Sequence, residues 1–258
     1  MRIVEPTYEI TFHHPEGFDS MEQFLERVAR TCYKSEDKIT DDSAERLLEA
    51  LMKSGHHAMV EHCLVTVRFV ADRGFTHEEV RHRLASFAQE STRYVNYTKG
   101  RHGAEITVVA LPDVEGMTQE LRDYWEHCME KYEKAYFKAE ELAKKGGIKK
   151  AAQIARMWLP IGVKSEIVVT ANLREWNTIF GLRADEPAHP IMKKLSRAVM
   201  KEFYKKIPAI YGPVYRRLTA PKDLTPSERL KALAEVMVQM EKLRGRAAAL
   251  KMTEPHEN

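Results

Sequence analysis

The sequence predicts an α+β fold, in which an antiparallel or mixed sheet packs against helices. Residues 8–12 and 63–69 alternate apolar and polar side chains, as half-buried strands do, and residues 106–111 and 166–171 are two further strand candidates. Between them lie segments whose apolar residues recur at helical spacing. The order of the two kinds of segment follows no regular strand–helix–strand alternation, which argues against a doubly wound parallel sheet.

The first third of the chain predicts one strand, two helices and a second strand. Pro15 and Gly17 end the strand over 8–12. Ser20 and Gln23 form a potential capping box, which predicts a helix directly after it. A second helix follows Asp42, and the strand over 63–69 comes next. The apolar stripes of the two helices contain Met21, Leu25, Val28 and Cys32, and Leu47, Leu48 and Leu51.

A second potential capping box, Thr76 with Glu79, predicts a short helix from this point. Its apolar stripe would consist of Val80, Leu84 and Phe87. On such a helix Arg81 and Arg83 flank the stripe and His82 points away from it.

The second half of the chain is predominantly helical. After the strand over 106–111, a long helix runs from about Met117 to Lys145, followed by a short helix that ends at Trp158, the strand over 166–171 and a helix over 175–182. Thr225 to Glu228 is a third capping box and begins a final helix. We therefore expect a main domain over 1–220 and a C-terminal helical extension over 221–258. The seam of the long helix is Leu121, Trp125, Cys128, Tyr132, Ala135, Ala139 and Leu142.

Composition excludes several classes of protein. The 258 residues suffice for one or two domains, and 41 basic against 38 acidic residues leave a net charge of +3, too weak a bias for a nucleic-acid-binding surface. No apolar run reaches the roughly 18 residues of a membrane span, and the first residues do not resemble a secretory signal. We expect a cytoplasmic protein that binds neither nucleic acid nor membrane.

Neither a disulfide framework nor a metal site is expected. The three cysteines lie far apart without a CxxC pair, which favours three buried small side chains at Cys32, Cys63 and Cys128. His77, Glu78 and His82 approach the zinc motif HExxH, but a histidine spacing of five places the two rings about 140° apart on a helix.

The stretch that suggests chemistry is Arg81-His82-Arg83, followed after seven residues by Ser91-Thr92-Arg93-Tyr94. The arginines could simply extend their stems over a surface helix. Alternatively, the hydroxyls and amides of the Ser91 turn and the planar guanidinium of Arg93 suit an anion such as a phosphate. The residues by themselves indicate no more than a phosphorylated ligand.

The same stretch resembles the signature of the flavin-dependent thymidylate synthases, Arg-His-Arg-x7-Ser. Four other blocks resemble the family in the same order, and together the blocks span roughly residues 1 to 215. They are Ala29–Tyr33, Gly55-His56 with Glu61-His62, Ala155-Arg156-x-x-Leu159-Pro160, and Asn172-x-Arg174 with Leu182-Arg183-Ala184-Asp185.

The resemblance implies an activity, cofactors and an assembly. The family converts dUMP to dTMP and takes the methylene group from methylenetetrahydrofolate. Reduced FAD supplies the hydride, and NADPH reduces the flavin again. The enzyme is a homotetramer, and its active sites combine residues of several subunits.

The resemblance also implies a role for each matched residue. Arg183 would contact the uracil and stabilise its negative charge, as the one catalytic residue. The FAD would be held by His56, Glu61, Arg81, His82, Arg83, Gln89, Asn172 and Arg174. The nucleotide would be held by Arg81, Gln89, Glu90, Ser91, Thr92, Arg93, Arg156 and Arg183.

Some positions depart from the family pattern. Gln89-Glu90 replaces Asn-Glu of some members, Ala58 replaces a hydroxyl, and Thr178 replaces an asparagine. Glu78 stands where a glutamine can precede the motif, and its charge would lie awkwardly near a phosphate. These departures leave open a member that binds nucleotide and flavin without turnover. An RNA-binding protein is a third hypothesis, which the small net charge disfavours.

Overall fold

The computed structural model describes residues 1–98 and 104–220 and divides into a first unit, Met1–Tyr211, and a second unit that begins at Gly212. The first unit contains a four-stranded sheet in the order β2–β3–β6–β4, in which all neighbours are antiparallel. The strands are β2 (Thr7–Phe12), β3 (Leu64–Asp72), β6 (Lys164–Asn172) and β4 (Ala85–Gln89). Two short strands, β1 (Arg2–Val4) and β5 (Thr107–Val109), pair in parallel. The predicted α+β fold is confirmed.

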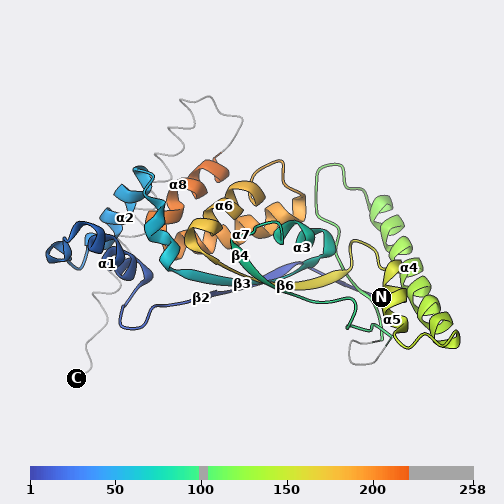
Figure 1. The fold of residues 1–258 in the computed structure, drawn as a ribbon. Coiled ribbons are helices and arrows are strands. Elements are labelled where there is room, and N and C mark those ends of the chain that lie inside the picture. The colour runs from blue at the N-terminus through green and yellow to red at the C-terminus, as the bar shows by residue number, and fades with distance from the viewer. Residues whose placement is uncertain (99–103, 221–258) are drawn as a thin grey trace, which may run out of the picture. The chain divides into compact units, whose positions relative to one another are not determined.

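Helices cover one face of the main sheet (Figure 1). They are α3 (Arg73–Glu79), α6 (Leu173–Arg183) and α7 (Pro190–Lys206). Alternate residues of β3 and β6, such as Val67 and Val169, are fully buried beneath them. The core at this face is aromatic: the rings of Trp176, Phe180, Phe203 and Tyr211 contact one another with centroids 5.0 to 5.7 Å apart.

The opposite face of the sheet is polar. The hydroxyls of Thr66 and Thr170 lie 2.8 Å apart on neighbouring strands, and Arg68 forms ion pairs with Glu9 and Glu166. The side chains on this face are partly exposed, as expected for an antiparallel sheet with one covered face.

Further helices lie at the two ends of the sheet (Figure 1). At one end are α1 (Met21–Tyr33) and α2 (Ser43–Lys53), and at the other are α4 (Gln119–Lys145) and α5 (Ala151–Ala155). The 3-10 turn Glu36–Lys38 joins α1 to α2, and the 3-10 turns His57–His62 and Arg156–Trp158 lead from α2 and α5 to the sheet. Helix α8 (Pro208–Thr219) crosses the boundary of the units. The Ser20 hydroxyl accepts a hydrogen bond from the Gln23 amide at 3.1 Å, so the first capping interaction forms as predicted.

The helix predicted from Thr76 is wrong in position. Asp72, at the end of β3, is the actual N-cap and accepts from the Phe75 amide at 2.9 Å. Consequently α3 begins at Arg73 and ends at Glu79, and the chain then turns back to pair β4 with β6. Leu84, expected in the apolar stripe, is 76% exposed. Arg81 and Arg83 therefore lie on a connection between helix and strand.

Two burial expectations are also wrong. On α4 the buried residues are Met129, Tyr136, Glu140 and Ala143, whereas Leu121, Tyr132 and Leu142 of the predicted seam are exposed. Only one side of α4 packs against α5 and the core around Ile106 and Val108, and this side is offset from the predicted seam. Of the cysteines, Cys63 is buried and Cys128 half-buried, but Cys32 is exposed.

Strand β1 and helices α7 and α8 were not predicted. The helix predicted after Thr225 lies outside the described residues. Among the residues that are described, no helix carries an apolar stretch long enough to cross a membrane.

Candidate active site

Arg183, the last residue of α6, lies at the centre of a partly buried polar network beside the motif. Its Nη1 is 2.6 Å from Glu78 Oε2, its Nη2 donates to the Glu78 carbonyl at 2.8 Å, and its Nε donates to His82 Nε2 at 3.0 Å. The guanidinium thus lies against the C-terminal end of α3, where the helix dipole favours a cation. Its side chain is 18% exposed, so the network is fixed but still reaches the surface.

His82 is held in one tautomer by this network. Burial and the positive charge of Arg183 lower the pKa of His82 to about 4, so the ring is neutral near pH 7. Because Nε2 accepts from Arg183, the ring proton lies on Nδ1, which is 3.7 Å from Glu175 Oε1. His82 therefore supports the Arg183 guanidinium from the interior of the protein, and its ring is only 5% exposed.

Glu79 is a second buried acid in this region, and the sequence reading assigned it only to a helix cap. It is 0% exposed, and neither carboxylate oxygen has a hydrogen-bond partner among the described residues. Burial raises the pKa of Glu79 to about 7, with Arg183 opposing and Glu78 reinforcing the shift. Burial also raises the pKa of Glu175. A helical hydrophobic pattern gives no signal for such acids, because it predicts apolar residues at buried positions.

The predicted phosphate-binding residues form a compact turn after β4. The amides of Tyr94 and Val95 both donate to the Ser91 carbonyl at 3.0 Å, and the Arg93 amide donates to the Ser91 hydroxyl at 3.3 Å. Thr92 is buried, whereas Arg93 and Tyr94 are exposed, with the guanidinium 5.7 Å from the ring centroid. The turn therefore presents a cation next to a hydroxyl, as an anion site requires.

Gln89 and Glu90, predicted to contact flavin and nucleotide, bind other parts of the protein in this structure. Gln89 Nε2 donates to the Thr76 hydroxyl at 2.6 Å. The Glu90 carboxylate accepts from the Tyr97 hydroxyl at 3.2 Å and pairs with Lys164 Nζ at 2.9 Å. Both side chains thereby fix the strand that leads into the Ser91 turn.

Four residues predicted to hold the flavin lie at or near the N-terminus of α6. Asn172 is the N-cap and accepts from the Glu175 amide at 2.8 Å. Arg174 forms an ion pair with Glu61. His56, just before the turn that carries Glu61, contacts the Tyr33 hydroxyl through Nδ1 at 3.4 Å. His56, Glu61 and Arg174 are exposed and Asn172 is half-buried. The length of α6 separates this group from Arg183 by about 16 Å at 1.5 Å per residue.

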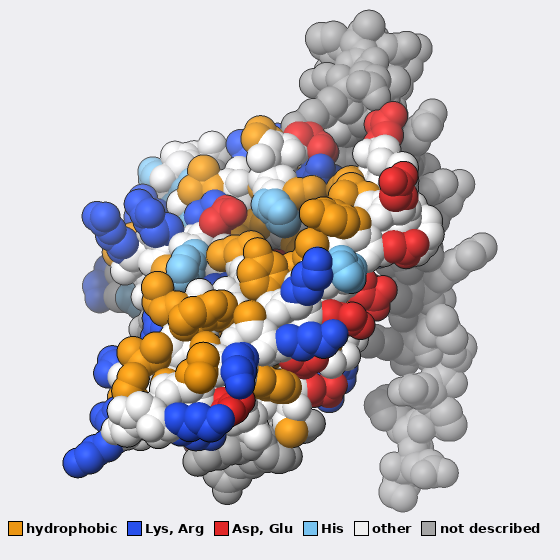
Figure 2. Space-filling model, turned by 90° about the vertical axis from the view of Figure 1, so that its right-hand side faces the viewer, with side chains coloured by type: hydrophobic (Ala, Val, Ile, Leu, Met, Phe, Trp, Pro, Cys, Tyr) orange, Lys and Arg blue, Asp and Glu red, His pale blue; other side chains and the backbone are white. Residues whose placement is uncertain are grey.

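The remaining predicted residues lie near the surface. Arg81 and Arg83 are exposed, and Arg156 is half-buried at the start of a 3-10 turn. Figure 2 shows apolar and basic side chains side by side on the face that it displays. Large exposed apolar side chains occur on α4, α5 and the chain after them, which marks a surface suited to association. Among these are Leu142, Ile154, Met157, Trp158 and Ile161.

The departures from the family pattern also have definite places. Glu78 does not approach the Ser91 turn through any contact that the structure shows, but pairs with Arg183. Ala58 is exposed in the turn between His56 and Glu61, and Thr178 lies one helical turn after Arg174.

The thymidylate synthase complementing protein family matches residues 17–209. Similar proteins named flavin-dependent thymidylate synthase include one from Corynebacterium diphtheriae, 32% identical over 222 residues, which cover 78% of this chain and 85% of that protein. Another is from Pyrococcus abyssi, 34% identical over 174 residues, or 67% of this chain and 68% of that protein. The chain therefore belongs to the thymidylate synthase complementing protein family, which confirms the resemblance found in the sequence.

A solved structure shares the fold. It is the UMP/dUMP methylase PolB from Streptomyces cacaoi, bound with 5-Br dUMP, with a TM-score of 0.60 and 23% sequence identity. The alignment covers 82% of this chain and 96% of PolB.

Proposed function

We propose that this protein is a flavin-dependent thymidylate synthase of the cytoplasm. It would convert dUMP to dTMP with methylenetetrahydrofolate as carbon donor and NADPH as the source of electrons. Membership of the family, the names of the similar proteins and the Arg183 network support this proposal. In the net reaction C5 of dUMP would exchange a proton for a methyl group. Methylenetetrahydrofolate would supply the CH2 unit and become tetrahydrofolate. Reduced FAD would supply the hydride and one proton and become oxidised FAD, and this proton and the one from C5 would be taken up by tetrahydrofolate.

The observation that carries the proposal is the fixed orientation of Arg183. A guanidinium has five N–H groups, and the bonds to Glu78 and His82 use three of them. The other two remain on the terminal nitrogens and can donate to a uracil carbonyl. C5 becomes nucleophilic when the uracil carries negative charge, and a cation already held in place would stabilise that charge without reorganising.

The Ser91 turn would hold the nucleotide phosphate. Ser91, the Thr92 amide and Arg93 supply donors from the turn, and Arg156 supplies a second guanidinium. Two guanidiniums match a phosphate dianion in charge and geometry. Arg81, exposed close to the His82 network, would contact the nucleotide from the other side.

The donors present fit FAD. Its pyrophosphate requires cations and N–H donors, and Arg81, Arg83, Arg174 and His56 supply exposed ones. When bound and reduced, the flavin would supply the hydride that completes the methyl group. Because α6 separates the Arg174 group from the Arg183 network, a single site would use the two groups from different subunits. The proposed homotetramer provides this arrangement, and the exposed apolar side chains around α5 support association.

No cysteine is needed as a nucleophile. Burial raises the pKa of Cys63 to about 12, so its thiolate is absent near neutral pH. Cys32 is exposed on α1, where its thiol contacts Met59, and Cys128 lies on α4. None of the three occurs in the Arg183 network or the Ser91 turn.

One observation favours a second candidate function. The ion pair with Glu78 partly neutralises Arg183, and a member in which this pair never opened toward substrate would bind dUMP and FAD without turnover.

The assay that distinguishes the two functions is formation of dTMP from dUMP, methylenetetrahydrofolate and NADPH by the purified full-length protein loaded with FAD. We expect dTMP that depends on each component. Binding of FAD and dUMP without any dTMP would establish the non-catalytic function, and a colourless protein that binds neither would refute both.

A further inference from the structure

The segment that carries the proposed phosphate turn is anchored on both sides by carboxylates, the half-buried Glu90 and the buried Glu140. Before the turn, Glu90 binds Lys164 of the sheet and the Tyr97 hydroxyl. After the turn, Asn96 and Thr98 bind Glu140 of α4. The resemblance assigns no role to Glu140.

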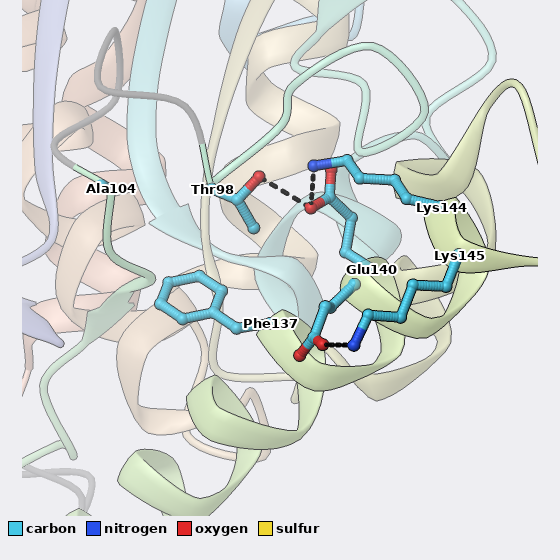
Figure 3. Close-up of a pocket in the computed structure, with 7 residues that line it drawn as sticks. Thr98, Ala104, Phe137, Glu140, Lys144 and Lys145 are labelled. Carbon is cyan, nitrogen blue, oxygen red and sulfur yellow. Dashed lines mark hydrogen bonds and ion pairs between the residues drawn. The ribbon is translucent and has the colours of Figure 1, made fainter.

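The carboxylate of Glu140 accepts hydrogen bonds from the segment after the turn and from a lysine of its own helix (Figure 3). Its Oε1 accepts from Asn96 Nδ2 at 2.8 Å, and its Oε2 lies 3.0 Å from the Thr98 hydroxyl and 2.5 Å from Lys144 Nζ. Burial alone would raise the pKa of Glu140, but the bonds from Lys144, Asn96 and Thr98 outweigh it and lower the pKa. A charged acceptor that is 3% exposed therefore holds the segment.

Aromatic contacts one helical turn earlier add to this anchor. The Tyr97 amide donates to the Tyr136 hydroxyl at 3.5 Å, and the two rings meet edge to face with centroids 5.8 Å apart. Tyr136 and Glu140 lie on the same face of α4 because four residues separate them. Three consecutive residues, Asn96 to Thr98, are thus tied to one helix.

The next residue on α4 provides a contrast. Glu141 is 45% exposed and pairs only with Lys138 and Lys145 of its own helix in the bonds that the structure shows. Both glutamates thus pair with a lysine four residues on, but only Glu140 contacts the segment after the turn.

We propose that Glu140 is a positioning residue for the nucleotide phosphate, an inference that rests on the function proposed above. By holding Asn96 and Thr98, it fixes the Ser91–Arg93 turn before the nucleotide arrives. Ordering a loop at the moment of binding reduces affinity, and a loop that is ordered beforehand avoids this loss. Glu140 itself contacts neither the phosphate nor the reacting atoms.

The test compares Glu140→Gln with Glu141→Gln in the full-length, FAD-loaded enzyme. We expect the KM for dUMP of Glu140→Gln to rise about tenfold, the effect of losing one good bond to a charged group. Its kcat at saturating dUMP and its flavin spectrum should stay close to those of the wild type. Glu141→Gln should leave KM and kcat unchanged.

A split of this kind separates positioning from general destabilisation, because partial unfolding lowers kcat per total protein and leaves the KM of the folded fraction unchanged. If Glu140→Gln does not fold, Thr98→Val removes one donor from the segment and should raise KM in the same direction by a smaller factor. An unchanged KM in both variants, or a loss confined to kcat, would overturn the inference. A wild-type protein that fails to bind dUMP would instead refute the proposed function.

Discussion

An arginine lies at each end of α6, but the two arginines differ in burial and in their partners. At the C-terminal end, Arg183 is mostly buried and bonded to Glu78 and to a neutral His82. At the N-terminal end, Arg174 is exposed, and the only partner that the structure shows for its guanidinium is Glu61. The first guanidinium is already oriented for chemistry, whereas the second can move to a ligand or to another subunit. The comparison suggests that chemistry belongs to the Arg183 end and flavin binding to the Arg174 end.

Replacing Arg183 should produce the largest effect. Arg183→Ala is expected to fold and to bind FAD but to lose about 10²–10³ in the rate of dTMP formation, the usual loss for one well-placed charge donor. The measurement is turnover per flavin-loaded enzyme at saturating dUMP. Turnover near that of the wild type would remove Arg183 from the catalytic role.

Glu79→Gln tests how much the buried, unpaired carboxylate of Glu79 destabilises the protein near Arg183. Folding raises the pKa of Glu79 from 4.5 to about 7. The stability that its proton confers is therefore present below pH 4.5 and is lost as the pH rises to 7. At pH 8 the variant should be more stable than the wild type by up to about 3 kcal/mol.

The pH dependence of unfolding provides the measurement for Glu79. The gain of Glu79→Gln should shrink steadily as the pH falls from 7 toward 4.5, and the same change at exposed Glu49 serves as the control. His82 acts in the opposite direction, because folding lowers its pKa from 6.5 to about 4 and its contribution is lost as the pH falls through this range. A gain that does not vary with pH would show that Glu79 is not a buried, unpaired acid.

Arg174→Ala tests the other end of the comparison. We expect FAD to bind about tenfold more weakly, because one charge-assisted bond to its pyrophosphate is lost. With FAD at saturation the rate should recover, in contrast to Arg183→Ala. Titration of FAD against the apoprotein measures the first effect, and a rate that stays low at saturating FAD would place Arg174 in the chemistry.

Replacing all three cysteines by alanine or serine should have a smaller effect on activity. Neither end of α6 uses a thiol, so turnover per folded, flavin-loaded enzyme is expected to stay within a few-fold of the wild type. Stability should fall at Cys63, where a packed sulfur is removed from the core. If one cysteine replacement abolished turnover while FAD and dUMP still bound, a protein nucleophile would be required.

The smallest effect is expected from deleting the residues after Asp223. All blocks that match the family precede this point, so FAD binding should survive, with some loss of stability. A soluble truncated protein that cannot hold FAD would place the extension in the site.

Features contained in neighbouring residues were predicted better than features that depend on distant partners, although one local capping signal also failed. Ser20 caps α1 as its neighbour Gln23 suggested, because both members of a capping box lie within one turn. Thr76 offered the same signal, but Asp72 had already begun the helix, and β4 pairs with a strand about 80 residues away. Leu121 and Leu142 are exposed because other elements pack against a different side of α4. The periodicity of the helix alone does not show which side its neighbours cover.

The candidate site shows the same division. The residues came from the resemblance, and the structure joins Arg183 to His82 and Arg174 to Glu61 across about 100 residues of sequence. The burial of Glu79, Glu140 and Glu175 was not predicted, because charged residues are seldom buried and only the packed fold shows what surrounds them.

The most direct test of the account is a single turnover without NADPH. The flavin of the purified enzyme is first reduced under anaerobic conditions, and dUMP and methylenetetrahydrofolate are then added while the flavin spectrum and dTMP are followed together. The account predicts one dTMP for each FAD oxidised in the wild type and in the cysteine-free variant, with Arg183→Ala remaining reduced over the same time. Formation of dTMP without oxidation of the flavin, or a wild-type enzyme whose bound flavin stays reduced in the presence of both substrates, would contradict it.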